Sequence, residues 1–213
     1  GAASAWFILT ANSWMNSPAG FTVKNGVVTN VNPFAAIFNP ATPFEATHMI
    51  LACYVAVGFA IAAIYAVAFL RGHRTDYNRK GLMLGMGLGS VAIPLQIVSG
   101  DFNARFLEQS QPIKYAAMEG IVRSGRGLPL YIGGIPNPDT GQVSGAIQIP
   151  HGESLFAHLD LNSPSVGMDA FPKNDWPNAV AVHLTFDLMV ACGIFLLLVA
   201  AVFWFRYWRG KHA

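Results

Sequence analysis

The run "MILACYVAVGFAIAAIYAVAFL", residues 49–70, contains no charged residue and no proline. A helix needs about 20 predominantly apolar residues to cross the hydrocarbon core of a bilayer. The run therefore predicts a membrane-spanning helix over residues 43–70, and it decides the fold class. Two further apolar stretches, 81–99 and 177–207, approach or exceed this length. Together the three stretches predict an all-α integral membrane protein.

The composition of the chain excludes several classes of protein. Hydrophobic residues make up 53% and charged residues 11%, whereas about a quarter of a soluble domain is charged. A soluble enzyme is therefore excluded. The net charge of +2 comes with no basic cluster interleaved with aromatics, so no nucleic-acid partner is expected. Cys53 and Cys192 lie in apolar runs and are predicted to be small buried side chains, with neither a disulfide nor a metal role.

The N-terminal stretch is too short for a complete span. About ten mostly apolar residues lead directly into the polar segment "NSWMNSP", residues 12–18. Neither a basic region nor a cleavage site of a signal peptide is present. We therefore expect residues 1–16 to be a truncated transmembrane helix, and the chain to be an internal piece of a larger protein.

Basic residues predict the orientation of the spans. Arg71, Arg74, Arg79 and Lys80 follow the first span, and a second basic group, which includes Lys211, follows the third. Lysine and arginine are enriched on the cytoplasmic side of membrane proteins. The predicted order is a truncated helix (1–16), an extracytoplasmic loop (17–42), a span (43–70), a cytoplasmic loop (71–80), a span (81–99), an extracytoplasmic loop (100–176), a span (177–207) and a cytoplasmic tail (208–213).

The second span and the long loop carry distinct patterns. Gly81, Gly85 and Gly89 recur every four residues, a spacing that allows close approach of helix backbones in membranes. The loop over 100–176 is far longer than an ordinary connection and is rich in proline and glycine. We expect it to be an ordered but irregular cap with one or two short helices.

Four residues in the outer parts of the spans are candidate site residues: His48, His183, Asp187 and Met189. Ionisable residues within spans are costly and usually functional, and histidine and methionine are common haem ligands. At 1.5 Å per residue, His48 and His183 each lie about 34 Å above the first arginine after their span, and Met189 about 25 Å. Depth slightly favours His48 with His183, but either partner remains possible. His183 and Asp187, four residues apart, are also placed to pair with each other.

Several blocks, in this order, resemble subunit I of the cytochrome bd family of bacterial quinol oxidases. They are "ANSWM" (11–15), "GD" (100–101), "QPIKYAAMEG" (111–120) and "HLTFDLMVACG" (183–193). The resemblance implies a quinol:oxygen oxidoreductase with two b haems and one d haem. It also implies a location in the bacterial inner membrane among lipid, a second large membrane subunit as partner, and ubiquinol or menaquinol as substrate.

The resemblance also implies roles for particular residues. His48 and Met189 correspond to the axial ligands of the low-spin haem b, which makes His183 a structural residue beside Asp187. Asp187 itself stands where many relatives carry arginine. Lys114 and Glu119 correspond to the quinol-site pair of the long loop. A carboxylate there accepts a proton from quinol, and an ammonium group stabilises negative charge that develops on the other ring oxygen.

The family's oxygen-reducing haem pair is held by segments that this chain does not match. We therefore expect these residues to form the electron-entry part of the oxidase, without the oxygen-reducing site. The alternative is a cofactor-free membrane transporter or scaffold subunit, for which glycine and proline interruptions of the spans are typical. Against this alternative, the ionisable residues cluster near the outer ends of the spans, and no inverted repeat is visible.

Overall fold

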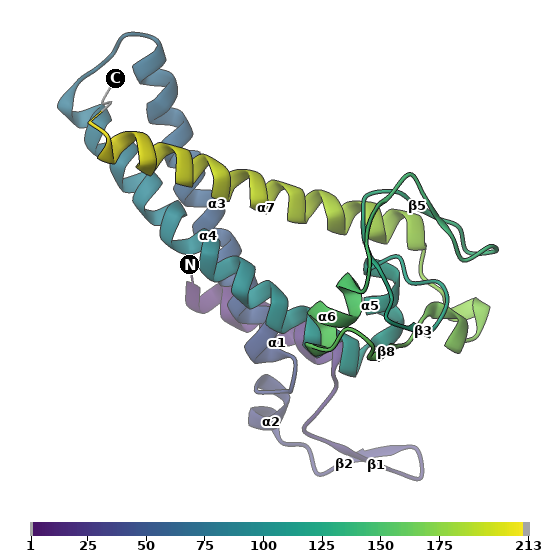
Figure 1. The fold of residues 1–213 in the computed structure, drawn as a ribbon. Coiled ribbons are helices and arrows are strands. Elements are labelled where there is room, and N and C mark those ends of the chain that lie inside the picture. The colour runs from purple at the N-terminus through teal and green to yellow at the C-terminus, as the bar shows by residue number, and fades with distance from the viewer. Residues whose placement is uncertain (1, 211–213) are drawn as a thin grey trace. The chain divides into compact units, whose positions relative to one another are not determined.

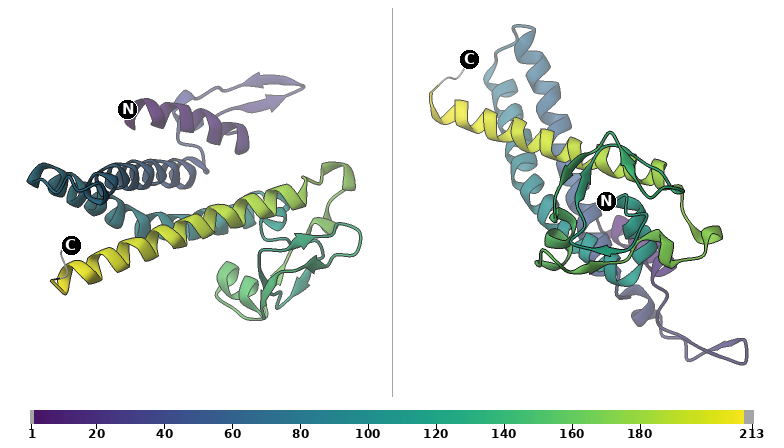
Figure 2. Two further views of the ribbon diagram at one scale, coloured as in Figure 1. Left: turned by 90° about the horizontal axis from the view of Figure 1, so that it is seen from above. Right: turned by 45° about the vertical axis from the view of Figure 1, so that its right-hand side comes forward.

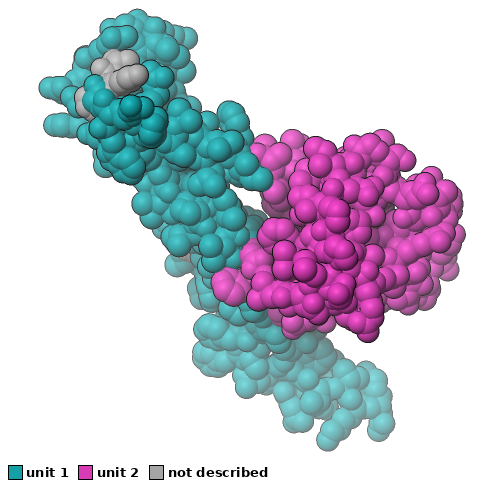
Figure 3. Space-filling view, in the orientation of Figure 1, with its two compact units in different colours: residues 1–100, 193–213 teal, residues 101–192 magenta. Residues whose placement is uncertain are grey.

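The computed structural model describes residues 2–210, without the side chain of Ala2. Residues 211–213 of the predicted tail, including Lys211, and residue 1 of the predicted truncated helix lie outside the described residues. The chain forms two compact units, one of residues 1–100 with 193–213 and the other of residues 101–192 (Figure 3). We describe each unit by itself.

Three helices are long and apolar enough to cross a membrane. They are α3 (Thr42–Leu70), α4 (Asp76–Ser110) and α7 (Ala179–Trp208), with 29, 35 and 30 residues. α4 extends past both ends of the apolar stretch 81–99, because "DYNRK" and "DFNARFLEQS" continue the helix without being apolar. Hydropathy thus marks the part of a helix that suits the bilayer, and helix ends can lie well beyond it. The first unit also contains α1 (Ala2–Asn16), β1 (Thr22–Lys24), β2 (Val27–Thr29) and α2 (Pro33–Ile37) (Figure 1).

A buried polar network joins α1 to the beginning of α3. The Ser13 and Thr42 hydroxyls lie 2.9 Å apart, and the Asn39 amide donates to Ser13 Oγ at 3.0 Å. Asn39 Oδ1 accepts from the backbone N–H groups of Ala41 and Thr42. Since the first N–H groups of a helix have no partner within the helix, Asn39 satisfies donors that would otherwise be buried alone. β1 and β2 form an antiparallel hairpin between α1 and α2.

Small residues bring α3 and α4 into backbone contact, as the glycine spacing predicts. A Cβ atom added at Gly58 would lie 2.5 Å from the Gly89 nitrogen, and one added at Gly85 would lie 2.6 Å from the Ala62 nitrogen. Both views in Figure 2 show the two helices side by side. Ala92, Ile93 and Val55 pack beside this contact. The glycines therefore serve helix packing in this unit.

We expect Gly58→Ala to destabilise the protein by about 1–3 kcal/mol, because the added methyl group meets backbone atoms that cannot rotate away. Gly87→Ala is the matched control on α4, since a Cβ there meets no heavy atom within 4 Å. Thermal unfolding of the purified full-length protein measures both variants. Equal midpoints for the two variants would contradict this account of the packing.

The second unit is built around short elements of the predicted loop. Its core consists of apolar side chains from α4, α5, η1, the start of α7 and the chain after α5: Leu107, Tyr115, Ala116, Ala117, Ile121, Val122, Met168 and Ala179. Short strands pair antiparallel as β3 with β8, β4 with β7 and β5 with β6. The elements are α5 (Pro112–Met118), β3 (Gly125–Arg126), β4 (Leu130–Ile132), β5 (Ile135–Pro136), β6 (Val143–Ser144), β7 (Ile147–Ile149), α6 (Gly152–His158), β8 (Pro164–Ser165), η1 (Met168–Ala170) and η2 (Lys173–Asp175).

One prediction about the cysteines is wrong. Cys53 and Cys192 are free thiols, as expected, but both side chains are exposed. The spans are apolar on all sides, so their sequence does not distinguish a face covered by protein from a face left open to an apolar solvent. Burial was inferred from apolar neighbours along the chain, whereas it depends on neighbours in space.

Candidate functional site

His48 lies near the beginning of α3, half-buried, with both ring nitrogens engaged. Its Nδ1 donates to Ser99 Oγ at 3.0 Å, and the Gln96 amide donates to Nε2 at 2.9 Å. In this arrangement the lone pair of Nε2 accepts the amide proton, so Nε2 would bind a metal only in place of that hydrogen bond. Gln96 Oε1 is buried and has no hydrogen-bond partner among the described residues.

Met189 and His183 lie on the same helix but in contrasting environments. The Met189 side chain is 52% exposed, whereas His183 is fully buried. His183 Nδ1 lies 2.7 Å from the Met118 carbonyl oxygen, and Nε2 lies 3.2 Å from that of Gly133. Both ring nitrogens therefore lie at hydrogen-bond distance from backbone oxygens, and neither is free to bind a metal in this arrangement. Asp187 Oδ2 lies 3.4 Å from Nε2, so the pairing that the spacing of four residues predicts is present.

His183 and Asp187 together hold the loop against α7. Asp187 Oδ2 accepts from the Gly133 N–H at 2.7 Å, so the two side chains bind both the N–H and the carbonyl of one loop residue. Gly120, which follows α5 with a φ of +71°, passes directly over the His183 ring, and a Cβ there would lie 3.3 Å from Cε1. A left-handed residue in contact with a ring is a position that suits glycine.

Lys114 and Glu119 lie on α5 and at its C-cap. Pro112 begins the helix at a position where the missing N–H costs nothing. Glu119 is 9% exposed, while Lys114 is half-buried. Five residues of helix separate their directions by about 140°, and the two make no ion pair within the described residues. Burial first, and then the charges of Glu153 and Asp187, raise the pKa of the Glu119 carboxyl to about 8.

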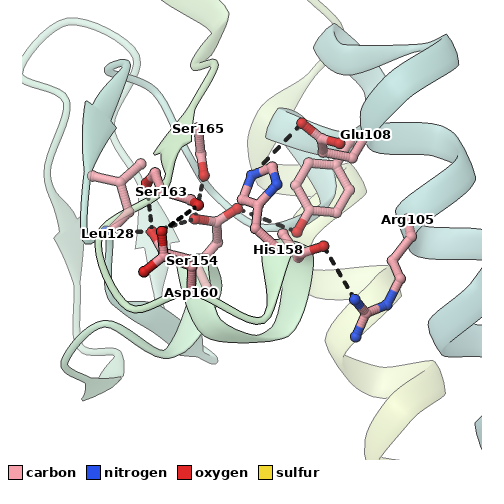
Figure 4. Close-up of polar contacts among 11 residues, drawn as sticks. Arg105, Glu108, Leu128, Ser154, His158, Asp160, Ser163 and Ser165 are labelled. Carbon is pink, nitrogen blue, oxygen red and sulfur yellow. Dashed lines mark hydrogen bonds and ion pairs between the residues drawn. The ribbon is translucent and has the colours of Figure 1, made fainter.

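A second buried carboxylate, Glu153, lies on α6 and was missed by the sequence analysis. It is 1% exposed and accepts three side-chain hydrogen bonds. The donors are Tyr115 Oη at 3.3 Å, Ser165 Oγ at 2.6 Å and, at 3.4 Å, Ser154 Oγ, whose one proton is shared with the nearer Ser163 carbonyl at 3.1 Å. Figure 4 shows this cluster with Ser154 and Ser165 labelled. The stretch "HGES", residues 151–154, does not indicate a buried carboxylate, because a glutamate in the first turn of a helix is ordinarily solvated.

The end of α4 lies beside the same cluster (Figure 4). Arg105 binds Asp101 at 3.0 Å and donates to the Ala157 carbonyl at 3.3 Å, which ties α4 to α6. Glu108 Oε1 lies 3.8 Å from His158 Nε2. Among residues 2–210, no group of three or more histidine, cysteine or acidic side chains is arranged to hold a metal ion. The described site therefore consists of separate ligand candidates and a carboxylate-rich loop.

Comparisons with known proteins agree with this architecture. The family model for cytochrome bd terminal oxidase subunit I matches residues 1–212. A putative cytochrome bd menaquinol oxidase subunit I of Bacillus subtilis is 33% identical over 205 residues, which cover 94% of this chain and 46% of that protein. A cytochrome bd ubiquinol oxidase subunit 1 of the same organism is 31% identical over 209 residues, covering 92% and 44%.

A solved structure gives the same result for the fold. The bd oxidase from Geobacillus thermodenitrificans superposes with a TM-score of 0.86 at 36% identity, covering 95% of this chain and 46% of that one. The chain thus spans about half the length of the relatives that it matches. The predicted family is confirmed, as is a mostly helical protein with three apolar helices of spanning length. The chain belongs to the family of cytochrome bd terminal oxidase subunit I.

Proposed function

We propose that this chain is the electron-entry part of a quinol:oxygen oxidoreductase, a terminal oxidase of aerobic respiration in a bacterial inner membrane. Its three apolar helices cross the bilayer, residues 1–16 form part of a further span, and the loop over 100–176 lies on the extracytoplasmic face. Ubiquinol or menaquinol is the substrate, and a second large membrane subunit is the partner. The observation that carries this proposal is the buried carboxyl of Glu119 near Lys114, in a chain of the bd family.

Glu119 and Lys114 have different roles in the oxidation of quinol. Oxidation of quinol breaks two O–H bonds as its electrons leave, so a base is needed beside a hydroxyl group. Glu119 accepts the proton, and its raised pKa brings it close to the operating pH, where a general base is most effective. Lys114 lies five residues before Glu119 on the same chain segment, and its long, half-buried side chain reaches the second ring oxygen and stabilises negative charge as it develops.

His48 and Met189 are the proposed axial ligands of the low-spin haem b. Imidazole and thioether are ligand types that haem iron takes: His48 Nε2 would bind the iron in place of its hydrogen bond from Gln96, and Met189 presents a half-exposed thioether. The bonds of His183 to two loop carbonyls support Met189 over His183. When bound, the haem supplies the one-electron acceptor for quinol oxidation. In the full complex, a second haem b and haem d form the oxygen-reducing site.

The alternative of a cofactor-free transporter or scaffold is not favoured. The match to the bd family covers both the long loop over 100–176 and the three apolar helices, so one function accounts for both. In this chain the glycines at 58, 85 and 89 pack helix against helix, so they need no role in a substrate path.

We expect Lys114→Ala to lower quinol oxidation by the full-length oxidase about 10- to 100-fold, because a cation that stabilises developing charge is lost. The haem spectrum should be unchanged, since Lys114 is not a proposed ligand. Lys173→Ala is the matched control, a lysine of the same loop that lies 3.6 Å from Asp139 on the surface. Turnover of Lys114→Ala equal to that of Lys173→Ala would remove Lys114 from the quinol site.

A further inference from the structure

We propose that Tyr115 and Glu153 form a proton relay that takes the first quinol proton from Glu119, so that Glu119 can accept the second. The inference rests on the proposed function, since it concerns the fate of protons that Glu119 accepts. It assigns a role in quinol oxidation to a tyrosine of α5 and a glutamate of α6.

The geometry places the three residues in one cluster of the second unit. Tyr115 and Glu119 are four residues apart at the end of α5, so their side chains project from the same face of the helix. Tyr115 Oη donates to Glu153 Oε1 at 3.3 Å. Glu153 Oε2 is held by the Ser165 and Ser154 hydroxyls, so the carboxylate has a fixed orientation with one oxygen directed at the tyrosine.

The stoichiometry of quinol oxidation supplies the reason for a second carboxylate. Two electrons and two protons leave each quinol, and one carboxylate holds only one proton. In the relay, the protonated Glu119 carboxyl turns toward Tyr115, one helical turn back on the same face of α5. Its O–H bond breaks and its proton binds Tyr115 Oη. At the same time, the phenolic proton of Tyr115 passes to Glu153 Oε1. Glu119 returns to the carboxylate, Tyr115 is unchanged, and Glu153 holds the first proton.

The charges in the cluster suit this sequence of transfers. Burial, followed by the charges of Glu119 and Glu153, raises the pKa of the Tyr115 hydroxyl above its ordinary range. Tyr115 therefore does not ionise by itself and gives up a proton only as it receives one. Glu153 and Asp187 also act on the charge of Glu119, so transfer of a proton to Glu153 removes one of the negative charges that oppose ionisation of Glu119.

The test uses Tyr115→Phe and Glu153→Gln in the full-length oxidase. Glutamine keeps the volume and the acceptor oxygen for Ser165 or Tyr115 but cannot take a proton. We expect each variant to lower kcat about tenfold, less than the two to four orders of magnitude that a general base itself contributes, because Glu119 remains. KM for quinol should stay within about twofold of the wild type. The double variant should lose no more than either single variant, because residues of one path act as a unit. Infrared difference spectra should show the carboxylic acid of Glu119 titrating at a shifted pH in both variants.

Tyr131→Phe and Asp175→Asn are the controls, a tyrosine and an exposed carboxylate of the same loop outside the cluster. Unchanged kcat in both relay variants, while Lys114→Ala and Glu119→Gln are slow, would overturn the relay and leave the proposed function standing. Normal turnover in all four variants would overturn both. If Tyr115→Phe and Glu153→Gln prevent assembly of the oxidase, or if their effects add, the pair has a packing role and the relay is contradicted.

Discussion

Full-length oxidase carrying Met189→Leu is expected to lose the absorbance of its low-spin haem b completely, because leucine has no lone pair to offer the iron. His48→Ala should remove the same signal, since its Nε2 is the proposed nitrogen ligand. Both residues lie on helices of membrane-spanning length, and both ligand types hold haem iron in proteins. Reduced-minus-oxidised spectra of purified protein, with haem extracted and quantified, measure the effect.

Met49→Leu and His73→Ala are the matched controls. Met49 is exposed and adjacent to His48 on α3, and His73 lies in the loop after that helix. Both controls should keep the wild-type spectrum. A low-spin signal that survives Met189→Leu but is lost in His183→Ala would assign the second ligand to His183. That result would also require His183 to release its hydrogen bonds to Met118 and Gly133.

Glu119→Gln is expected to lower quinol oxidation at least about 100-fold, because glutamine cannot accept a proton and general bases contribute two to four orders of magnitude. The haem spectrum should not change. Glu108→Gln is the matched control, a partly buried glutamate at the end of α4. A turnover of Glu119→Gln within about twofold of the control would remove Glu119 from the proton-accepting role.

The rate of quinol oxidation by the wild type should rise with pH and level off above about 8, because Glu119 acts as a base only when ionised and its pKa is raised to about 8.

The free energy of unfolding should change with pH in the opposite direction. Between pH 4.5, the ordinary pKa of the group, and about 8, the folded protein binds more protons than the unfolded chain. The stabilising contribution is complete below pH 4.5 and is lost as pH rises to about 8. The charges of Glu153 and Asp187 act on Glu119, and Tyr115 lies one turn away on α5. All three remain in Glu119→Gln, so comparison of its pH profile with that of the wild type isolates the contribution of Glu119.

The spans were predictable from the sequence because their signal is local. An apolar run such as 49–70 has the length of a bilayer core whatever the rest of the chain does, and Gly58 and Gly89 meet because small residues allow it. The short strands of the second unit were not predictable. Strands of two or three residues are too short to show alternation, and their pairing, as between Leu130 and Ile149, joins distant parts of the chain.

The candidate site, like the fold, was only partly predictable from the sequence. Lys114, Glu119 and Met189 lie in blocks that carry the family resemblance, and the resemblance also implies the role of His48. Glu153 is not identified in this way, because its importance comes from Tyr115 and Ser165, which reach it from other elements. The role of His183 was likewise open until its two nitrogens were seen to face the carbonyls of Met118 and Gly133.

The attachment of His183 to the loop has a mechanical consequence. One rigid imidazole bridges the first turns of α7 and the residue that precedes Glu119, and Asp187 fastens the Gly133 turn to the same helix. Close-packed interiors transmit displacement rather than absorb it. We therefore expect a displacement of the first turns of α7 to shift the backbone beside Glu119, the proposed base.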